Sequence, residues 1–389
     1  MRVIEVSQRY PPALGGVEAT LAQLVAHLRR AGVDVEVLTT DLARTMPFRR
    51  LPPAATVAAD EGVVRVRAYP FAPLPLGLGV AAPGMLHRLL RAEGPLVHAH
   101  AFGHPPAGFA ALAGRLRGTR WILTTHADPG RGSRVARLFH RAAAWGAVRR
   151  ADAVVVQSEG ERRFLAGLGV DPRRMVTIPT GIDLPPERPP GRKGPADGPC
   201  RLLCVGRLDL AQKGLDVLID AVARVSRVVP VRLDLAGDDW GAVPAIARQV
   251  HRLGLGDRVR WAVSPTAEAI AEAYARADVF VLASRFESFP RVLVEALAEG
   301  LPIVATRVGG VEELVGTGGA ALLVPPGDPD ALARAIAEVA ADPERRRRMA
   351  EAARARAGRY AWETIVPRYL ALFAAVSEGR FPERIGSPS

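Results

Sequence analysis

The feature that most constrains the fold is a Pro- and Gly-rich stretch, residues 184–199, which separates two halves of the chain that repeat one pattern. In each half, short apolar runs typical of buried strands alternate with segments whose apolar residues recur at helical spacing. Strands that alternate with helices favour a parallel sheet covered by helices on both faces. The sequence therefore predicts an α/β protein with two doubly wound, Rossmann-like domains and a linker without secondary structure between them.

The same division sets the expected domain boundaries. We expect four parts in chain order: an N-terminal domain over 1–183, the linker over 184–199, a second domain over 200–360, and a final helix and tail over 361–389. Residues 43–62 and 70–84 are rich in Pro and Gly and are expected to form long loops.

Composition places the chain among ordinary globular proteins. It has 389 residues, 49% hydrophobic and 24% charged, and no apolar run reaches the roughly 18 residues that a membrane span needs. The chain begins on a strand, so we expect no secretory signal and a cytoplasmic location, with the protein either free or held at the inner membrane face. Cys200 and Cys204 are expected to be buried apolar residues rather than a disulfide or a metal site.

The net charge of +12 is concentrated in the first half of the chain. Residues 1–190 contain 25 arginines and no lysine against 15 acidic residues. This excess indicates either an anionic partner or a compositional bias toward arginine. A nucleic-acid binder needs clustered basic residues with stacking aromatics, but aromatic residues make up only 5% of the chain. We therefore expect no nucleic-acid partner.

Residues 278–299 carry the most informative motif. An apolar strand over 279–283 is followed by a polar turn that holds Glu287, and then by a helix that starts near Pro290 and carries Glu295. Ligands of open α/β sheets bind at the carboxyl ends of the strands, where a helix N-terminus favours an anion. Carboxylates beside that anion accept hydrogen bonds from hydroxyl groups, so the two glutamates suit a polyol phosphate. The alternative is that they are solvated surface groups, which is the commoner case for such a pair.

A second turn, between a strand over 201–205 and a helix over 215–225, offers two cations, Arg207 and Lys213. Arginine supplies a planar fork and lysine a compact charge, and together they suit a diphosphate. A solvent-facing turn is the alternative interpretation.

Further candidates lie at strand ends in the first half. Gly15 and Gly16 follow the first strand, and paired glycines let the backbone approach a phosphate or a sugar closely. His126 follows another strand. His98 and His100 end a third, and for these two we favour a structural role.

Together these motifs resemble those of glycosyltransferase family 4, the retaining group 1 glycosyltransferases, over nearly the whole chain. The resemblance rests on three motifs: Gly-Gly-x-Glu at 15–18, Gly-Arg-Leu…Lys-Gly at 206–214, and Glu-x7-Glu at 287–295. It implies the GT-B fold, in which two domains face each other across a cleft and the last helix, near 362–377, crosses back to the first domain. It also implies retention of the anomeric configuration, no cofactor, and a nucleoside-diphosphate sugar, UDP or GDP, as donor substrate.

The resemblance also implies roles for individual residues. Arg207 and Lys213 would hold the diphosphate, and Glu295 would bind the ribose hydroxyls. Glu287 would orient the sugar, which His126 would contact from the other domain. The residues expected to be catalytic are Glu287, His126, Arg207 and Lys213. The residues expected to bind the donor are Gly15, Gly16, Arg207, Lys213, Glu287, Ser288, Phe289, Arg291, Val292 and Glu295, with Val263 and Ser264 beside the nucleobase. No Asp-x-Asp motif follows a strand, so we expect no metal ion.

The chain departs from the family pattern at three positions. Many members have Phe-Gly-Leu after the first glutamate of the signature, whereas this chain has Pro290 in place of the Gly. Proline has no backbone N–H to donate, so the two N–H groups that follow become the expected phosphate donors. Thr180 replaces the usual Asn, and the Gly that is usual near Val263 is absent.

The acceptor stays open on the sequence alone. Residues 134–150 are predicted to form a basic amphipathic helix, which suits either packing on the sheet or peripheral contact with an anionic membrane. A sugar, a polyol, a sugar phosphate, a lipid-linked acceptor and a polysaccharide all fit. Two other functions are alternatives: a non-catalytic sugar-nucleotide-binding protein, and a sugar-nucleotide epimerase of the same fold, against which the Glu-x7-Glu signature argues.

Overall fold

The computed structural model describes residues 1–13, 15–44, 48–53, 61–71, 79–94, 96–126, 146–186 and 198–380. The chain divides into two compact units. Unit 1 comprises Met1–Gly181 and Trp362–Ser389, and unit 2 comprises Ile182–Ala361. Most of the expected linker, residues 187–197, lies outside the described part of the chain.

Unit 1 is built on a seven-stranded sheet in which all neighbouring strands are parallel. In spatial order its strands are β11 (Met175–Thr177), β10 (Ala153–Val156), β9 (Trp121–Thr124), β8 (Leu96–His100), β1 (Arg2–Val6), β2 (Asp34–Thr40) and β5 (Val63–Val66). The strands are nearly continuous apolar runs because helices cover both faces of the sheet. The order reverses between β1 and β8, which is the switch point where doubly wound sheets bind ligands.

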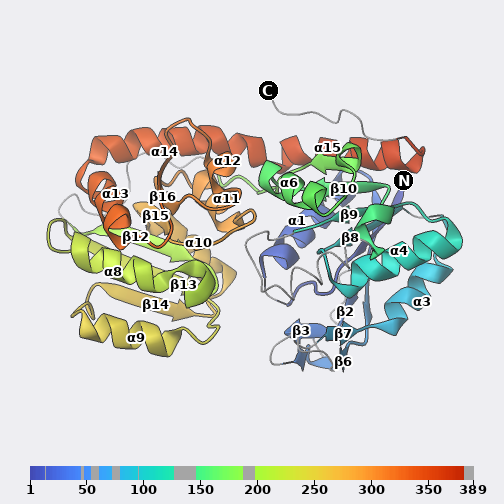
Figure 1. Cartoon of the computed structure of the whole chain (residues 1–389), viewed down its shortest axis with the longest axis horizontal. Helices are drawn as coiled ribbons and strands as arrows, with labels where there is room; N and C mark the ends of the chain where they lie inside the picture. The colour runs from blue at the N-terminus through green and yellow to red at the C-terminus, as the bar shows by residue number, and fades with distance from the viewer. Residues whose placement is uncertain are drawn as a thin grey trace. The chain divides into compact units, whose positions relative to one another are not determined.

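Helices cover both faces of the unit 1 sheet (Figure 1). Each face and the helices on it form one hydrophobic cluster. The helices are α1 (Gly16–Arg30), α3 (Pro83–Arg91), α4 (Pro105–Arg117), α6 (Glu159–Gly167) and α15 (Trp362–Ser377), with short 3₁₀ turns at Val148–Arg150 and Pro172–Arg174. The sequence fixes the ends of α4 clearly. Two prolines open its first turn, where no N–H partner is lost, and Gly118 ends it at φ 69°.

Two segments expected to be loops contain short antiparallel strand pairs, so that expectation is wrong in part. In the first, β3 (Leu42–Arg44) pairs with β4 (Arg49–Arg50), and in the second, β6 (Tyr69–Phe71) pairs with β7 (Gly79–Ala81). The proline and glycine content of these segments predicted loops. Each pair is a two-stranded sheet, and proline is tolerated on strands whose outer edge is unpaired, so the composition did not exclude strands.

The final helix, α15, belongs to unit 1 although it follows unit 2 in the sequence. Its Trp362 and Phe373 are fully buried in the cluster that also contains residues of β1 and α1. Gly181 lies against the Trp362 ring so closely that an added Cβ would be 2.4 Å from a ring carbon. The helix therefore completes the core on one face of the unit 1 sheet.

Unit 2 repeats the architecture with a six-stranded parallel sheet. In spatial order its strands are β14 (Val259–Val263), β13 (Val231–Gly237), β12 (Cys200–Val205), β15 (Val279–Leu282), β16 (Ile303–Thr306) and β17 (Ala321–Val324). Its helices are α7 (Leu210–Lys213), α8 (Leu215–Val225), α9 (Val243–Arg252), α10 (Ala267–Arg276), α11 (Arg291–Ala298), α12 (Val311–Val315), α13 (Pro329–Ala341) and α14 (Pro343–Ala357), followed by a 3₁₀ turn at Gly358–Tyr360.

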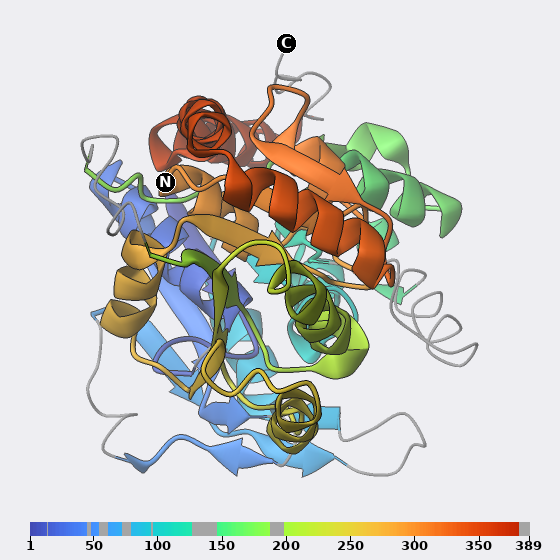
Figure 2. The same ribbon diagram turned by 90° about the vertical axis from the view of Figure 1, so that its left-hand side faces the viewer.

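These helices also lie on both faces of their sheet (Figures 1 and 2). The strand order reverses between β12 and β15, which makes this the switch point of unit 2. The prediction of two doubly wound parallel-sheet domains is confirmed.

Three other expectations can be compared with the described residues. Cys200 and Cys204 are buried free thiols, and burial raises the pKa of each to about 12. The expected basic helix over 134–150 lies outside the described residues except for 146–150. No described helix has both the length and the apolar character that crossing a membrane requires.

The contact between Gly181 and Trp362 leads to a stability prediction. In Gly181→Ala the new methyl group overlaps a fully buried ring, so we expect a loss of about 1–3 kcal/mol in the free energy of unfolding. Urea denaturation would measure it. Gly108→Ala is the control, because Gly108 is an exposed α4 residue with no atom near an added Cβ. Equal stability of the two variants would contradict the proposed packing.

Candidate active site

In unit 2, the loops after β12 and β15 are neighbours at the switch point. The two strands pair in parallel, with Leu202 opposite Val279 and Leu203 opposite Phe280. Their carboxyl ends therefore bring residues 206–214 next to residues 284–290. This is the edge of the sheet where the sequence predicted a ligand.

The centre of this region is a buried ion pair. Lys213 Nζ donates to Glu287 Oε1 at 2.6 Å, and the Ser284 hydroxyl donates to the same oxygen at 2.7 Å. The lysine and glutamate side chains are 10% and 7% exposed, so each charge is stabilised mainly by its partner rather than by water. Because both contacts use Oε1, Glu287 Oε2 is the oxygen with capacity to accept a ligand hydroxyl.

Two glycines allow the backbone to close around this ion pair. Gly214 has φ 60°, and an added Cβ would lie 2.2 Å from the Ala283 carbonyl oxygen. Gly309 has φ 49°, and an added Cβ would lie 1.6 Å from the Glu287 carbonyl oxygen. Both the left-handed backbone and the close approach require glycine. The Glu287 loop is therefore enclosed by backbone that has no room for a side chain.

Arg207 provides a second cation on the loop after β12. Its guanidinium donates to Gln212 Oε1 at 2.5 Å, and its central carbon lies 4.7 Å from the centre of the Trp240 ring. A guanidinium on an aromatic face is attracted by the ring electrons. These contacts hold the group in place, so this end of the sheet presents two fixed cations, Arg207 and Lys213.

The helix after the Glu287 loop begins as the sequence predicted. Pro290 is the N-cap of α11, so the N–H groups of Arg291 and Val292 lie in the first turn, where a helix provides no carbonyl partners. Glu295 is already oriented: Oε1 accepts from Arg291 Nε at 2.8 Å and Oε2 accepts from the Tyr274 hydroxyl at 2.9 Å. The Arg291 side chain therefore holds Glu295 in its orientation.

The remaining residues predicted in unit 2 have mixed positions. Phe289 is buried in the core and packs edge-on against Tyr360, so its side chain is structural. The Ser288 carbonyl accepts from Gly310 N at 3.1 Å. Val263 is exposed at the end of β14, and the Ser264 hydroxyl donates to Asp238 Oδ1 at 2.8 Å.

The switch point of unit 1 carries a buried polar cluster. Glu5 on β1 accepts from two histidines of β8, His98 Nδ1 at 2.9 Å and His100 Nε2 at 2.7 Å. His98 Nε2 also hydrogen-bonds the Thr124 hydroxyl at 2.7 Å, and the Tyr369 side chain of α15 hydrogen-bonds Thr124. The histidines therefore have the structural contacts that we favoured from the sequence.

Charge within this cluster is set by burial and by hydrogen bonds. Burial by itself would raise the pKa of Glu5, but His98 and His100 outweigh burial and lower the pKa to about 2. Burial, together with the neighbouring His98, lowers the pKa of His100. The ligand atoms of the three residues lie within 4.8 Å of one another and are able to hold a metal ion. In the structure these residues hydrogen-bond one another. The expected absence of a metal ion stays a prediction.

His126 lies at the same edge of the unit 1 sheet, just after β9. Its backbone has φ 47°, and its ring stacks on His100 with centroids 5.9 Å apart. Burial and the neighbouring His100 hold the pKa of His126 well below its usual range, so the ring is neutral at physiological pH.

The glycine turn of unit 1 is held by a carboxylate. Gly15 is the N-cap of α1, and Gly16 opens the helix. Glu18 is buried and forms an ion pair with Arg9 at 2.6 Å. A Cβ added to Gly15 would lie 2.0 Å from a Glu18 carboxylate oxygen, so the Glu18 side chain packs directly against the glycine turn.

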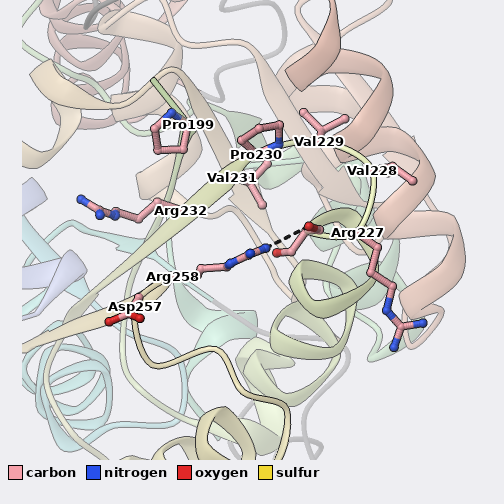
Figure 3. A pocket seen from close by; sticks show the side chains of 10 residues that line it. Pro199, Arg227, Val228, Val229, Pro230, Val231, Arg232, Asp257 and Arg258 are labelled. Carbon is pink, nitrogen blue, oxygen red and sulfur yellow. Dashed lines mark hydrogen bonds between the residues drawn. The ribbon is translucent and has the colours of Figure 1, made fainter. Parts of the chain in front are cut away.

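A hollow of about 420 Å³ lies at the amino ends of the unit 2 strands, around the starts of β12, β13 and β14 (Figure 3). Three arginines line it, Arg227, Arg232 and Arg258, and Arg258 donates to the Ser226 carbonyl at 2.9 Å. Doubly wound sheets bind ligands at the opposite, carboxyl edge. We therefore assign the candidate site to the switch-point loops and not to this hollow.

Comparison with known families matches both units. The family model described as "Glycosyl transferases group 1" matches residues 190–356, and the one described as "Glycosyltransferase Family 4" matches residues 14–185. The chain is 31% identical to a D-inositol 3-phosphate glycosyltransferase of Kineococcus radiotolerans, over 96% of this chain and 93% of that protein. It is 30% identical to a glycogen synthase of Mycobacterium tuberculosis, over 97% and 96%.

Solved structures share the architecture. Anabaena HepE in complex with UDP superposes with a TM-score of 0.77 at 23% identity, covering 96% of this chain and all of that one. Sucrose-phosphate synthase from Thermosynechococcus elongatus superposes with a TM-score of 0.75 at 27% identity, covering 96% and 99%. The similarity extends over the full length of these proteins.

The structure brings together Arg207, Lys213, Glu287 and the first turn of α11 in unit 2, while Gly15, Gly16 and His126 belong to unit 1. Sequence reasoning missed several residues that contact the predicted ones, namely Ser284 beside Glu287, Tyr274 beside Glu295, Trp240 beside Arg207, Gln157 beside His126, and Glu5 beside His98 and His100. A signal existed for Glu5, since a lone carboxylate in an apolar strand needs a buried partner. Tyr274 and Trp240 gave no signal, because aromatic residues at such positions are usually core.

The Lys213–Glu287 pair leads to a prediction about stability. Lys213→Met leaves a buried carboxylate without its counter-charge, so we expect a loss of about 3–5 kcal/mol in the free energy of unfolding. Adding Glu287→Gln should restore part of this loss, because the second change removes the unpaired charge. Arg276→Ala, which breaks an exposed pair with Glu272, is the control and should cost less than about 1 kcal/mol. Additive losses in the double variant would contradict a buried pair.

The unit 1 cluster leads to a prediction about pH. The unfolded chain protonates His100 below about pH 6.5, whereas the folded protein keeps it neutral. Stability should therefore be full above pH 6.5 and fall as the pH drops, by up to about 1.4 kcal/mol per pH unit from this residue. His100→Gln keeps a donor for Glu5 without titrating, so urea denaturation between pH 7.5 and 5 should show a shallower loss. Parallel slopes for the two proteins would show that the folded state does not exclude the proton.

Proposed function

The chain belongs to the group 1 glycosyltransferases, and on this premise we propose that it moves a sugar from a UDP-sugar to a hydroxyl of a small polyol phosphate. We propose further that the reaction retains the anomeric configuration and needs no metal ion. The observation that carries the proposal is the arrangement at the unit 2 switch point, where Lys213 pairs with Glu287, Arg207 lies on the same loop as Lys213, and α11 begins just after Glu287.

Each part of this array suits one part of a nucleotide sugar. The two cations and the N–H groups of the first α11 turn favour the diphosphate. Glu295, oriented by Tyr274 and Arg291, accepts hydrogen bonds from the ribose hydroxyls. Glu287 Oε2 accepts a hydrogen bond from a hydroxyl of the sugar, and this contact positions the anomeric carbon for attack. UDP is proposed as the nucleotide because the structurally similar HepE was solved in complex with UDP.

The chemical step requires charge stabilisation more than a dedicated base. As the bond between the anomeric carbon and the phosphate oxygen breaks, its electron pair stays on the diphosphate, and Arg207 and Lys213 stabilise the growing negative charge. The acceptor oxygen attacks from the face that the diphosphate leaves, so the configuration is retained. The acceptor proton passes to the departing phosphate oxygen. Fixed cations on side chains supply the stabilisation that a metal ion supplies in other transferases.

The acceptor proposal comes from the relatives. Matched relatives over more than 90% of this chain are D-inositol 3-phosphate glycosyltransferases, which points to a polyol phosphate. The glycogen synthase match makes a glucan the second candidate. A cytoplasmic location, with or without peripheral membrane contact, stays a prediction.

The test is nucleotide release from a panel of UDP-, GDP- and ADP-sugars, with each of four acceptors: inositol 3-phosphate, inositol, fructose 6-phosphate and glycogen. We expect release from a UDP-sugar that rises most with inositol 3-phosphate and does not change in excess EDTA. NMR of the product should show the anomeric configuration of the donor. A product of opposite configuration, or loss of activity in EDTA that added metal restores, would overturn the corresponding part of the proposal.

The leaving-group role can be tested with two matched arginines. Arg207→Ala should lower kcat by about 10²–10³-fold, because it removes stabilisation that grows in the transition state. Arg227→Ala, an exposed arginine at the hollow of Figure 3, should leave kcat within about twofold, because it lies at the other edge of the sheet. Equal effects of the two substitutions would remove Arg207 from the active site.

A further inference from the structure

The loop that carries Glu287 is tied to the loop after β12 by another of its residues, Arg285. Its guanidinium forms two hydrogen bonds with one carboxylate: Nη1 donates to Asp216 Oδ1 at 2.9 Å, and Nη2 donates to Asp216 Oδ2 at 2.7 Å. Nη1 also donates to the Leu210 carbonyl oxygen at 2.6 Å. A two-pronged pair fixes the orientation of both groups as well as their distance. Arg285 therefore joins its own loop to the first residue of α7 and the first turn of α8.

The backbone of Arg285 makes a further contact with the same segment. Its N–H donates to the carbonyl oxygen of Gln212 at 2.7 Å, directly before Lys213 in the chain. Gln212 is 6% exposed, and its side-chain oxygen accepts from the Arg207 guanidinium at 2.5 Å. Gln212 thus connects the two loops twice, since its backbone holds the Arg285 loop and its side chain holds Arg207.

The pair between Arg285 and Asp216 is ionised although it is partly buried. Burial by itself would raise the pKa of Asp216, but the hydrogen bonds and charge of Arg285 help to outweigh burial and lower the pKa. The same hydrogen bonds raise the pKa of Arg285. The two side chains are 36% and 39% exposed, and a pair with this much solvent access adds little to the stability of a fold. Its main effect is therefore on the geometry of the loops that it joins.

We propose that Arg285 and Asp216 are positioning residues, which clamp the two switch-point loops together and so preform the site for the donor diphosphate. Without this clamp, the loop that carries Arg207 and Lys213 can move relative to the loop that carries Glu287, and the donor must pay the cost of ordering them. The inference rests on the proposed function, in which those three side chains bind the donor. Arg285 and Asp216 act through them and need no contact with the donor.

A second arginine–aspartate pair joins the same two strands at their amino ends and provides a matched control. Arg201 on β12 donates through Nε to Asp278 Oδ2 and through Nη2 to Asp278 Oδ1, both at 3.1 Å. Asp278 directly precedes β15, and the two side chains are 26% and 15% exposed. This pair has the chemistry of the clamp but lies away from the switch-point loops. Its loss reports what the loss of such a pair does to the fold alone.

Arg285→Met and Arg201→Met are the matched variants, because each removes a forked guanidinium and keeps a long side chain. We expect Arg285→Met to lower kcat/KM for the UDP-sugar by about 10–100-fold, since small misplacements of binding groups cost that much. Arg201→Met should change it by less than about threefold, because ligands bind at the carboxyl ends of the strands. Arg285→Lys keeps the charge without the fork and should retain more activity than Arg285→Met. Equal effects of the two methionine variants, both folded, overturn the inference.

A double variant tests whether the two residues act as one unit. Asp216→Asn removes the charge that Arg285 meets, and we expect it to lower kcat/KM in the same direction as Arg285→Met. If the residues work only through each other, the double variant should be no less active than Arg285→Met alone. Losses that multiply in the double variant overturn the shared role.

Acetylation of the Lys213 amine tests the clamp without any substrate. The sequence contains two lysines, Lys193 and Lys213, so peptide mass spectrometry assigns the product directly. In the structure the Lys213 side chain is 10% exposed and paired with Glu287, which predicts slow acetylation of the wild type. We expect Arg285→Met to raise the rate at least about tenfold through local opening of the loops, and Arg201→Met to leave it within about twofold.

The two kinds of measurement separate the two proposals. If the wild type turns over no UDP-sugar, the proposed function fails, while the acetylation rates still show whether Arg285 holds the loops together. If Arg285→Met and the wild type are acetylated at equal rates, the inference is overturned even for an active enzyme.

Discussion

The buried ion pair between Lys213 and Glu287 is the interaction on which the unit 2 site depends. Taking two charges out of water costs several kcal/mol for each ion unless each has a close partner and further hydrogen bonds. Here the partner contact is 2.6 Å and Ser284 supplies another hydrogen bond. The surrounding loops are constrained accordingly, with glycine at 214 and 309 where backbone passes within van der Waals reach of the loop carrying Glu287. The Glu287 carboxylate and the Lys213 ammonium group thus have fixed positions in the absence of any ligand.

The two units share one strand order but carry different chemistry at their switch points. Unit 2 offers fixed cations and a helix N-terminus, which suit phosphate. Unit 1 offers an ionised carboxylate enclosed by histidines and a neutral imidazole, His126, which suit hydroxyl groups. The same topology therefore carries different side chains at its two switch points, because it fixes where the strand ends meet and leaves the identity of the residues there free.

The sequence was sufficient for the parts of the fold that depend on local pattern. Strand and helix alternation predicted both parallel sheets, whereas the expectation of a last helix near 362–377 came from the family resemblance. The segments over 43–62 and 70–84 were misjudged, because strand pairing there depends on partners that local composition does not reveal. Arg207, Lys213 and Glu287 could be predicted because they belong to motifs. The contact between Lys213 and Glu287, 74 residues apart, was not predicted, because local pattern does not show which loops the topology brings together. The contact of Tyr274 with Glu295 required side-chain geometry.

The place of α15 in unit 1 has a consequence for biosynthesis. A chain emerging from the ribosome presents residues 1–181 first, but the helix that covers one face of their sheet is made only after all of unit 2. Until then, the apolar face that will receive Trp362 and Phe373 is covered by α1 but not by α15. Unit 2 is contiguous in sequence and can complete its core earlier. The half of the protein that is synthesised first is thus the half whose core is completed last, because part of one sheet face waits for a helix at the end of the chain.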